Sequence, residues 1–135
     1  MVIIDTSVWI FALRRNFLPL VKERVGQALI ESDVAINGII ELELLGGVRN
    51  DKEYGRLKDR LDGLHYIEME KRLWDAASRM AYDLNGKGAN IPATDILIAA
   101  SAIDNDAVLL HADAHFDTIA RHSKLKVESL VRHVK

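Results

Sequence analysis

The chain has 135 residues, a net charge of −2 and no cysteine, and each value excludes a class of protein. The length suits one domain over residues 1–135, and the apolar fraction of 49% is enough for a core and too high for a disordered chain. The lack of cysteine excludes disulfides, zinc–thiolate sites and a cysteine nucleophile, and it fits a reducing cytoplasm. The near-neutral charge argues against a protein that passively coats nucleic acid. No run reaches the roughly 18 apolar residues of a membrane span, and no basic leader is seen, so neither a membrane protein nor a signal peptide is expected.

Short apolar runs alternate with longer helical patterns, which predicts an α/β fold with a central, mainly parallel sheet of four to five strands flanked by helices. In the first half the sequence predicts, in order, a strand at 2–4, helices at 8–15 and 18–31, a strand at 33–36, and helices at 37–45 and 51–62. In the second half it predicts a strand at 66–69, helices at 71–84 and 93–105, a strand at 108–110, a helix at 115–122 and a strand at 126–130. Thr6 or Ser7 is expected to cap the first helix and Asn37 the third. Trp9 and Trp74 fall on apolar helical stripes, which favours core or dimer packing over base stacking.

Four acidic side chains stand where a strand ends or within a helix close to such an end: Asp5, Glu43, Asp95 and Asp113. Carboxylates in apolar segments are costly to bury unless something neutralises them, and Mg²⁺ prefers oxygen ligands. Ligands of parallel α/β sheets bind outside the carboxyl ends of the strands. We therefore expect these acids to meet in one pocket around Mg²⁺, with Mn²⁺ as a possible substitute, in an enzyme that acts on a phosphate-containing polymer.

Each acid taken alone also has a plainer interpretation. An Asp after a strand can simply form a turn or cap a helix, and Asp95 can simply favour the positive end of its helix dipole. Glu41 and Glu43 are two residues apart and cannot share one helix face, so one of them is expected to face solvent.

The motifs that carry these acids resemble those of PIN-domain ribonucleases, and in particular the VapC toxins of type II toxin–antitoxin systems. The stretches that resemble the four family motifs, in family order, are 4–10, 43–47, 92–102 and 110–117. The resemblance covers essentially the whole chain. The sequence departs from the family pattern at Ile40, where many of these toxins have Thr. Glu41 also competes with Glu43 as the acid of the second motif, and the spacing to Gly46 and Gly47 favours Glu43.

Membership of this family would imply a Mg²⁺-dependent endoribonuclease that inhibits translation and growth unless an antitoxin binds it. The metal ligands implied are Asp5, Glu43, Asp95 and Asp113, with Asp117 as a further acid near the site and Thr6 and Ser7 as supporting hydroxyls. The implied partners are RNA, a VapB-type antitoxin whose C-terminal segment covers the site, and a second copy in a homodimer. DNA would be contacted only through the antitoxin, no membrane is involved, and the location is cytoplasmic.

Two other functions remain open at this stage: a housekeeping PIN nuclease that trims RNA precursors, and a PIN-like binding module without catalysis. Aspartyl-phosphate chemistry is disfavoured because Ser7 stands where a second Asp would be needed. His111 and His115 flank Asp113 and could touch substrate, but ordinary turn or surface roles are favoured because an isolated histidine is a weak signal. Arg14, Arg15 and Arg49 are assigned to solvated helix faces, with contact to the RNA backbone as the alternative.

Overall fold

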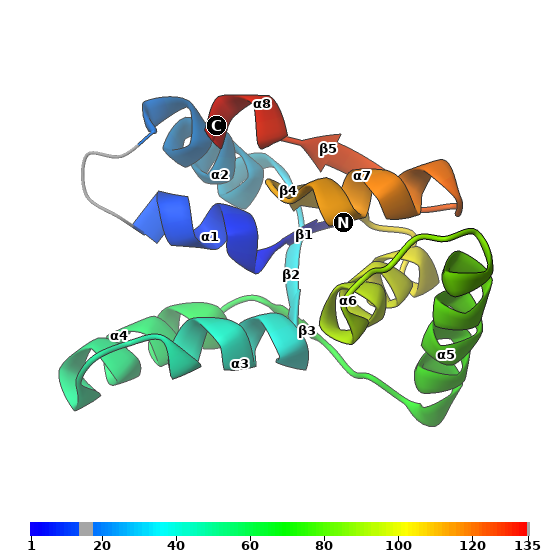
Figure 1. Cartoon of the computed structure of the whole chain (residues 1–135). Coiled ribbons are helices and arrows are strands. Elements are labelled where there is room, and N and C mark those ends of the chain that lie inside the picture. Colours follow the sequence, from blue (N-terminus) through cyan, green and yellow to red (C-terminus); the bar gives the residue numbers. More distant parts are fainter. Residues whose placement is uncertain (14–17, 135) are drawn as a thin grey trace.

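A computed structural model describes residues 1–13 and 18–134, and it shows one five-stranded parallel sheet (Figure 1). The strands are β1 (Val2–Ile4), β2 (Val34–Asn37), β3 (His65–Ile67), β4 (Val108–His111) and β5 (Lys126–Ser129). They lie in the order β3-β2-β1-β4-β5. The predicted α/β fold with a parallel sheet of four to five strands is therefore confirmed.

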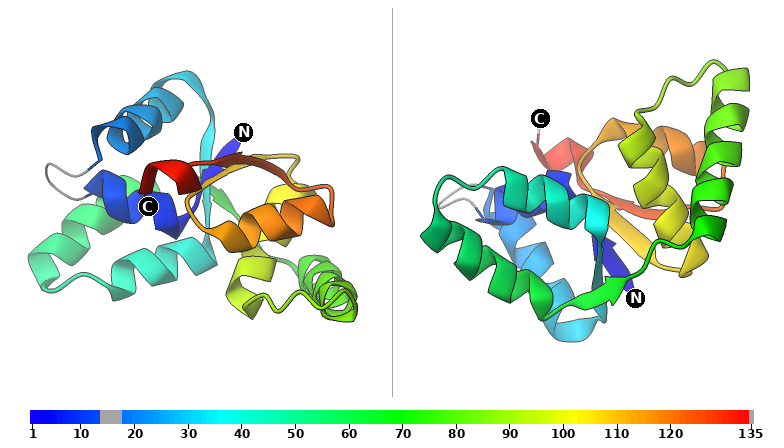
Figure 2. Two further views of the ribbon diagram at one scale, coloured as in Figure 1. Left: turned by 45° about the horizontal axis from the view of Figure 1, so that its top comes forward. Right: turned by 90° about the horizontal axis from the view of Figure 1, so that it is seen from below.

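Helices flank the sheet over the described part of the chain. They are α1 (Thr6–Leu13), α2 (Pro19–Glu31), α3 (Gly38–Gly46), α4 (Asp51–Asp62), α5 (Lys71–Gly86), α6 (Ala93–Asp104), α7 (Ala114–Arg121) and α8 (Val131–Val134). The two views of Figure 2 agree that α1 to α4 gather at one end of the molecule and α5 with α6 at the other. Within these groups α1 packs on α2 and α3, and α5 packs on α6. None of the helices in residues 1–13 and 18–134 has the length and apolar character needed to span a bilayer.

The core is built on the two central strands. Ile3 and Ile4 of β1 and Leu109 and Leu110 of β4 are all fully buried, as expected for strands covered on both faces. Helix α6 is buried over most of its length, from Ile96 to Ala102, because it packs on α3, α5, α7 and β4.

Four local details differ from the sequence prediction. The first helix begins at Thr6, and its cap is Asp5, whose Oδ2 accepts the Ser7 N–H at 3.0 Å; Thr6 and Ser7 are themselves helical. Strand β3 is one residue early and ends at Ile67, where its pairing with β2 ends. Trp74 is 47% exposed, so it does not belong to the core, and its packing in a dimer stays a prediction; the buried face of α5 is carried by Leu73, Ala77 and Leu84. The last helix, α8, was not predicted.

The predicted cap Asn37 is confirmed, since its Oδ1 accepts the Ile40 N–H at 3.0 Å, and Trp9 is buried as predicted. Residues 14 and 15, which complete the predicted first helix and carry two of the three arginines considered for RNA contact, lie outside the described residues.

The strand order creates a switch point between β1 and β4. From β1 the chain builds outward to β2 and then β3, whereas β4 lies on the other side of β1 and continues to β5. Connections therefore leave the carboxyl ends of β1 and β4 in opposite directions, which opens a crevice at the place where ligands bind in this class of sheet. Asp5 follows β1 directly, and Asp113 follows β4 after one intervening residue.

Candidate metal centre

Asp5 lies at the carboxyl end of β1 and is only 4% exposed. Its Oδ2 accepts hydrogen bonds from the Ser7 N–H at 3.0 Å and from the Ser7 hydroxyl at 2.6 Å. Burial raises the pKa of Asp5 to about 6, the Ser7 hydrogen bonds oppose the rise, and the charges of Asp95 and Glu43 add to it. The chain thus holds a carboxylate in a place where water solvates it poorly.

Ser7 also connects the ends of the two central strands. Its Oγ accepts the Ala112 N–H at 2.9 Å while its hydroxyl donates to Asp5, so one side chain ties the residue after β1 to the residue after β4. The hydroxyl of Ser7 thereby orients Asp5 relative to the segment that carries Asp113. This geometry agrees with the expectation that Ser7 assists the acids without binding the metal itself.

Asp113 caps α7 and meets the start of α6. Its Oδ1 accepts the His115 N–H at 2.9 Å, and the Nδ1 of the same histidine lies 3.4 Å from Oδ1. That Nδ1 is also 2.9 Å from Oδ2 of Asp95, in the first turn of α6. Burial raises the pKa of Asp95, the charge of Asp113 adds to this effect, and the His115 hydrogen bond opposes it.

Asp95, Asp113 and His115 thus form one cluster, in which one ligand atom from each residue lies within 4.8 Å of those from the other two. His115 was placed among ordinary turn or surface residues by its sequence, and the structure instead puts it between two of the predicted acids. The signal that could have identified it is its position two residues after Asp113, in the first turn of a helix that starts at the carboxyl edge of the sheet.

Glu43 approaches the same edge from α3. It is exposed, and the Thr6 hydroxyl donates to its Oε1 at 2.8 Å, which ties it to the residue beside Asp5. Glu41 behaves differently, because its Oε1 lies 3.2 Å from Nζ of Lys58 on α4. The structure therefore places Glu43, rather than Glu41, on the side of the helix nearest Asp5.

Asp117, one turn along α7, points to other partners. Its Oδ2 accepts the Ser129 hydroxyl at 3.1 Å, and its Oδ1 lies 3.1 Å from Nε2 of His111. The latter contact is close enough for an ion pair, but the ring N–H is not directed along it, so Nε2 has no hydrogen-bond partner in the described residues. Asp117 does not belong to the cluster of Asp95 and Asp113.

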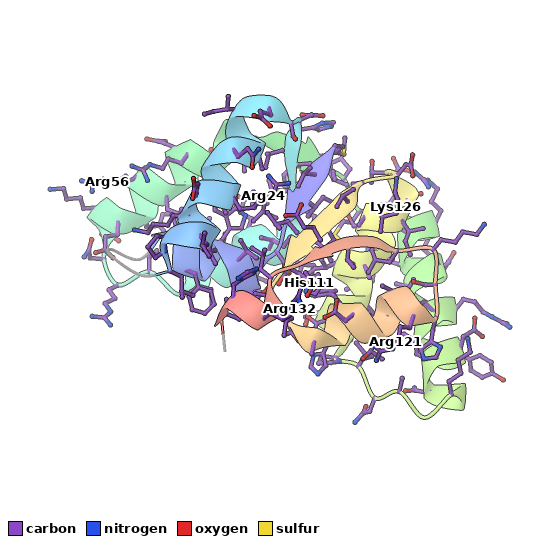
Figure 3. The ribbon with its side chains drawn as sticks, turned by 90° about the horizontal axis from the view of Figure 1, so that it is seen from above. Arg24, Arg56, His111, Arg121, Lys126 and Arg132 are labelled. Carbon is purple, nitrogen blue, oxygen red and sulfur yellow. The ribbon has the colours of Figure 1, made fainter. Side chains whose placement is uncertain are left out.

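The predicted turn or surface role of His111 is wrong, because the residue is completely buried at the end of β4, where β5 pairs with that strand (Figure 3). Its Nδ1 accepts the Asp113 N–H at 3.2 Å, and its ring packs against Phe116 with centroids 5.3 Å apart. Burial lowers the pKa of His111, and the nearby Asp117 opposes this effect. Because Nδ1 accepts a hydrogen bond, the neutral ring carries its proton on Nε2. His111 and Asp117 together support the turn that presents Asp113.

These residues fit a divalent cation. Within residues 1–13 and 18–134, no Lys or Arg forms an ion pair with Asp5, Glu43, Asp95 or Asp113. Several carboxylates at one edge without a Lys or Arg partner repel one another, and a hard cation with oxygen ligands removes that repulsion. The arrangement can therefore bind a metal ion and, through it, a phosphate group.

Comparison with known proteins agrees with this geometry. The family model of the PIN domain matches residues 2–122. A VapC ribonuclease of Mycobacterium bovis is 30% identical over 133 residues, which cover 96% of this chain and 98% of that protein. The chain belongs to the VapC branch of the PIN-domain family. Another VapC relative, Ribonuclease VapC51 of Mycobacterium tuberculosis, is 33% identical over 121 residues, covering 87% of this chain and 84% of the relative.

Solved structures show the same fold as this VapC-family chain. VapBC2 from Rickettsia felis bound to a fragment of promoter DNA superposes with a TM-score of 0.79 and 21% identity, covering 96% of this chain and 98% of the other. VapBC-1 from nontypeable Haemophilus influenzae gives a TM-score of 0.76 at 21% identity with the same coverage. At this level of identity the likeness establishes the fold alone.

Proposed function

We propose that this VapC-family chain is a divalent-metal-dependent endoribonuclease that hydrolyses RNA phosphodiester bonds. The observation that carries the proposal is the meeting of Asp95 and Asp113 at the carboxyl edge of the sheet, where the charge of Asp95 also reaches the buried Asp5. Among the described residues, no Lys or Arg pairs with these three acids. The names of the curated relatives, which are VapC ribonucleases, support the choice of RNA as substrate.

In this proposal Asp5, Asp95 and Asp113 hold Mg²⁺, for which Mn²⁺ can substitute. Glu43 is the fourth carboxylate at this edge of the sheet, and the four acids together are called the acidic edge. The cation would offset the negative charge of the phosphodiester and ease ionisation of a water molecule. Ser7 keeps the Asp5 carboxylate oriented, and Thr6 keeps Glu43 directed toward it. In the hydrolysis, the oxygen of that water would bond to phosphorus as the opposite P–O bond to the leaving sugar oxygen breaks. The water would give up one proton, and the leaving oxygen would take up a proton from solvent. Asp117 lies against His111 and outside the cluster of Asp95 and Asp113, so in this scheme it acts on the site through His111, and its direct part in metal binding stays a prediction.

The test is cleavage of RNA by the Asp5→Asn and Asp95→Asn variants, each with Mg²⁺ and with chelator. Both variants should lose cleavage, and the wild type should lose it when the cation is removed. Asp104→Asn is the matched control, because Asp104 lies at the other end of α6 and pairs with Arg72 on the surface. Circular dichroism checks that each variant is folded. Full activity in either site variant would remove the assignment.

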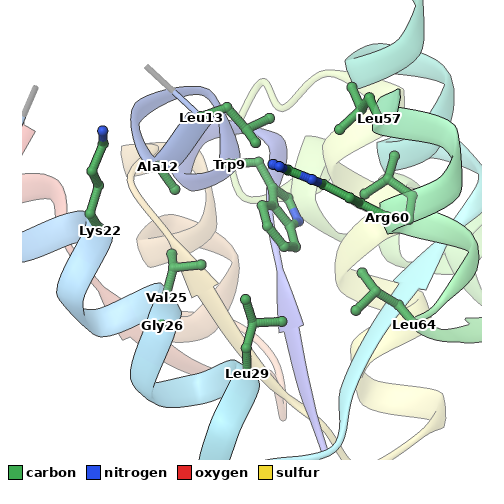
Figure 4. Close-up of a pocket in the computed structure, with 11 residues that line it drawn as sticks. Trp9, Ala12, Leu13, Lys22, Val25, Gly26, Leu29, Leu57, Arg60 and Leu64 are labelled. Carbon is green, nitrogen blue, oxygen red and sulfur yellow. The ribbon is translucent and has the colours of Figure 1, made fainter. Parts of the chain in front are cut away.

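We further propose that an antitoxin of the VapB type binds the groove between α1, α2 and α4. Trp9 points into this cavity of about 470 Å³, which Val25 and Leu29 line from α2 and Leu57 from α4 (Figure 4). Leu13 and Leu57 also line the adjoining hollow that contains Thr6 and Glu43. A bound apolar segment would therefore lead straight to the acidic edge, where a basic side chain could pair with the carboxylates.

The groove can be tested with two neighbouring residues of α2. Leu29 lines the cavity, whereas Ile30 is 86% exposed and does not. Leu29→Glu should release the antitoxin and restore toxicity in cells that express both proteins, and Ile30→Glu should leave the complex intact. Pull-down with a tagged antitoxin measures the difference. Equal binding by both variants would place the antitoxin elsewhere.

We also propose that the chain inhibits translation and growth when no antitoxin is bound, that it forms a homodimer, and that it acts in the cytoplasm. Expression without antitoxin should arrest growth, and sequencing of RNA 5′ ends from those cells would identify the cleaved RNA. Light scattering of the purified chain tests the homodimer.

A further inference from the structure

The position of His115 carries an inference about which cation the site prefers. Its backbone N–H donates to Oδ1 of Asp113, which fixes the residue in the first turn of α7. From there its Nδ1 lies 2.9 Å from Oδ2 of Asp95 and 3.4 Å from Oδ1 of Asp113. The nitrogen therefore stands between two carboxylates that no Lys or Arg of the described residues neutralises.

These distances suit atoms that share one ion. Ligands about 2.1 Å from a cation at neighbouring corners of an octahedron are about 3 Å apart. The separations of the His115 nitrogen from the two carboxylate oxygens, 2.9 Å and 3.4 Å, are of this size. The two carboxylate oxygens also lie within 4.8 Å of each other, so small side-chain movements would bring all three atoms to one cation.

His111, the buried histidine near the site, cannot take this role. The Nδ1 of His111 accepts the Asp113 N–H, and its Nε2 lies against Asp117, so neither nitrogen belongs to the cluster. In the absence of a cation, Nδ1 of His115 donates its proton to the Asp95 carboxylate. The side chain is 44% exposed, so when a cation takes the place of that proton the ring can carry its proton on Nε2, toward solvent, and Nδ1 then offers its lone pair.

Nitrogen ligands change the choice of metal. Mg²⁺ prefers oxygen and binds imidazole poorly, whereas transition-metal ions accept imidazole together with carboxylates. Building on the proposed metal-dependent function, we propose that His115 is a nitrogen ligand of the cation and makes this site select transition-metal ions such as Mn²⁺ over Mg²⁺.

The experiment uses Mn²⁺ as the probe, added to the full chain and observed by electron paramagnetic resonance. Electron spin-echo modulation from a coordinated ¹⁴N should appear in the wild type and disappear in His115→Gln. The Mn²⁺ affinity of that variant should fall by about tenfold or more, as is typical when a residue that supports a metal site is lost. The Mg²⁺ affinity, measured by competition, should change by less than about twofold because Mg²⁺ relies on the oxygen ligands. His122→Gln, at the exposed end of the same helix, is the control and should match the wild type.

Two outcomes would overturn the inference: Mn²⁺ bound by the wild type without nitrogen modulation, or an equal loss of Mn²⁺ and Mg²⁺ affinity in His115→Gln. The first needs no variant, so it stands even if His115→Gln folds poorly. The result is separable from the proposed function. If the protein shows nitrogen modulation but cleaves no RNA, the proposed nuclease function is refuted and the assignment of His115 as a ligand stands. If it cleaves RNA in a metal-dependent way without nitrogen modulation, the nuclease function stands and the assignment of His115 is refuted.

Discussion

Replacing Asp5 with Asn should stabilise the metal-free protein at neutral pH while it abolishes RNA cleavage. Folding raises the pKa of Asp5 from 3.8 to about 6, chiefly through burial. Between these values the folded state keeps a proton that the unfolded state has released, so the free energy of unfolding falls as pH rises through this window. The difference between the two pKa values corresponds to a loss of about 3 kcal/mol, at about 1.36 kcal/mol per pKa unit.

Asn carries no charge at any of these pH values, and its Oδ1 can still accept the hydrogen bonds from Ser7. The variant and the wild type should therefore be similarly stable where Asp5 is protonated. Their difference should grow as pH rises and reach at most about 3 kcal/mol above the folded-state pKa. This gain would show that the site holds its carboxylate at the expense of stability.

Urea denaturation in the presence of chelator, repeated from about pH 4 to about pH 8, measures this difference. Asp104→Asn, on the surface of α6, controls for the loss of one negative charge. Added Mg²⁺ should stabilise the wild type at neutral pH and leave Asp5→Asn unchanged. Parallel stability curves for Asp5→Asn and the wild type would refute the reasoning, because burial of the charge would then cost nothing.

Four further variants test the contacts of the acidic residues and of the two hydroxyls beside Asp5. Ser7→Ala removes the hydroxyl that donates to Asp5 and accepts the Ala112 N–H, so urea denaturation should show about 2–4 kcal/mol less stability. Thr6→Val releases the exposed Glu43 and should slow RNA cleavage several-fold, while the free energy of unfolding changes by less than about 1 kcal/mol. Glu43→Gln should lower the cleavage rate, and Glu41→Gln should not; equal losses in the two variants would contradict the placement of Glu43.

Much of the fold could be predicted because its signals are local. Buried parallel strands are short apolar runs, as at Val2–Ile4, and the helices between them repeat apolar residues at helical spacing. Trp74 shows where this reasoning fails. It continues the apolar stripe of α5, but which residues of a stripe are covered depends on the neighbouring element, and α6 leaves Trp74 half exposed.

The sequence by itself determined the α/β fold and the acids that follow its strands, because strand and helix periodicity and the position of an acid along the chain are properties of neighbouring residues. Only the tertiary structure decided which side chains meet. It brought His115 to Asp95 from 20 residues away, turned Asp117 toward His111, and set Glu43 rather than Glu41 beside Thr6. These contacts depend on how α3, α6 and α7 pack on the sheet. Such packing brings together residues that are far apart in the sequence, so their contact cannot be read from local sequence patterns.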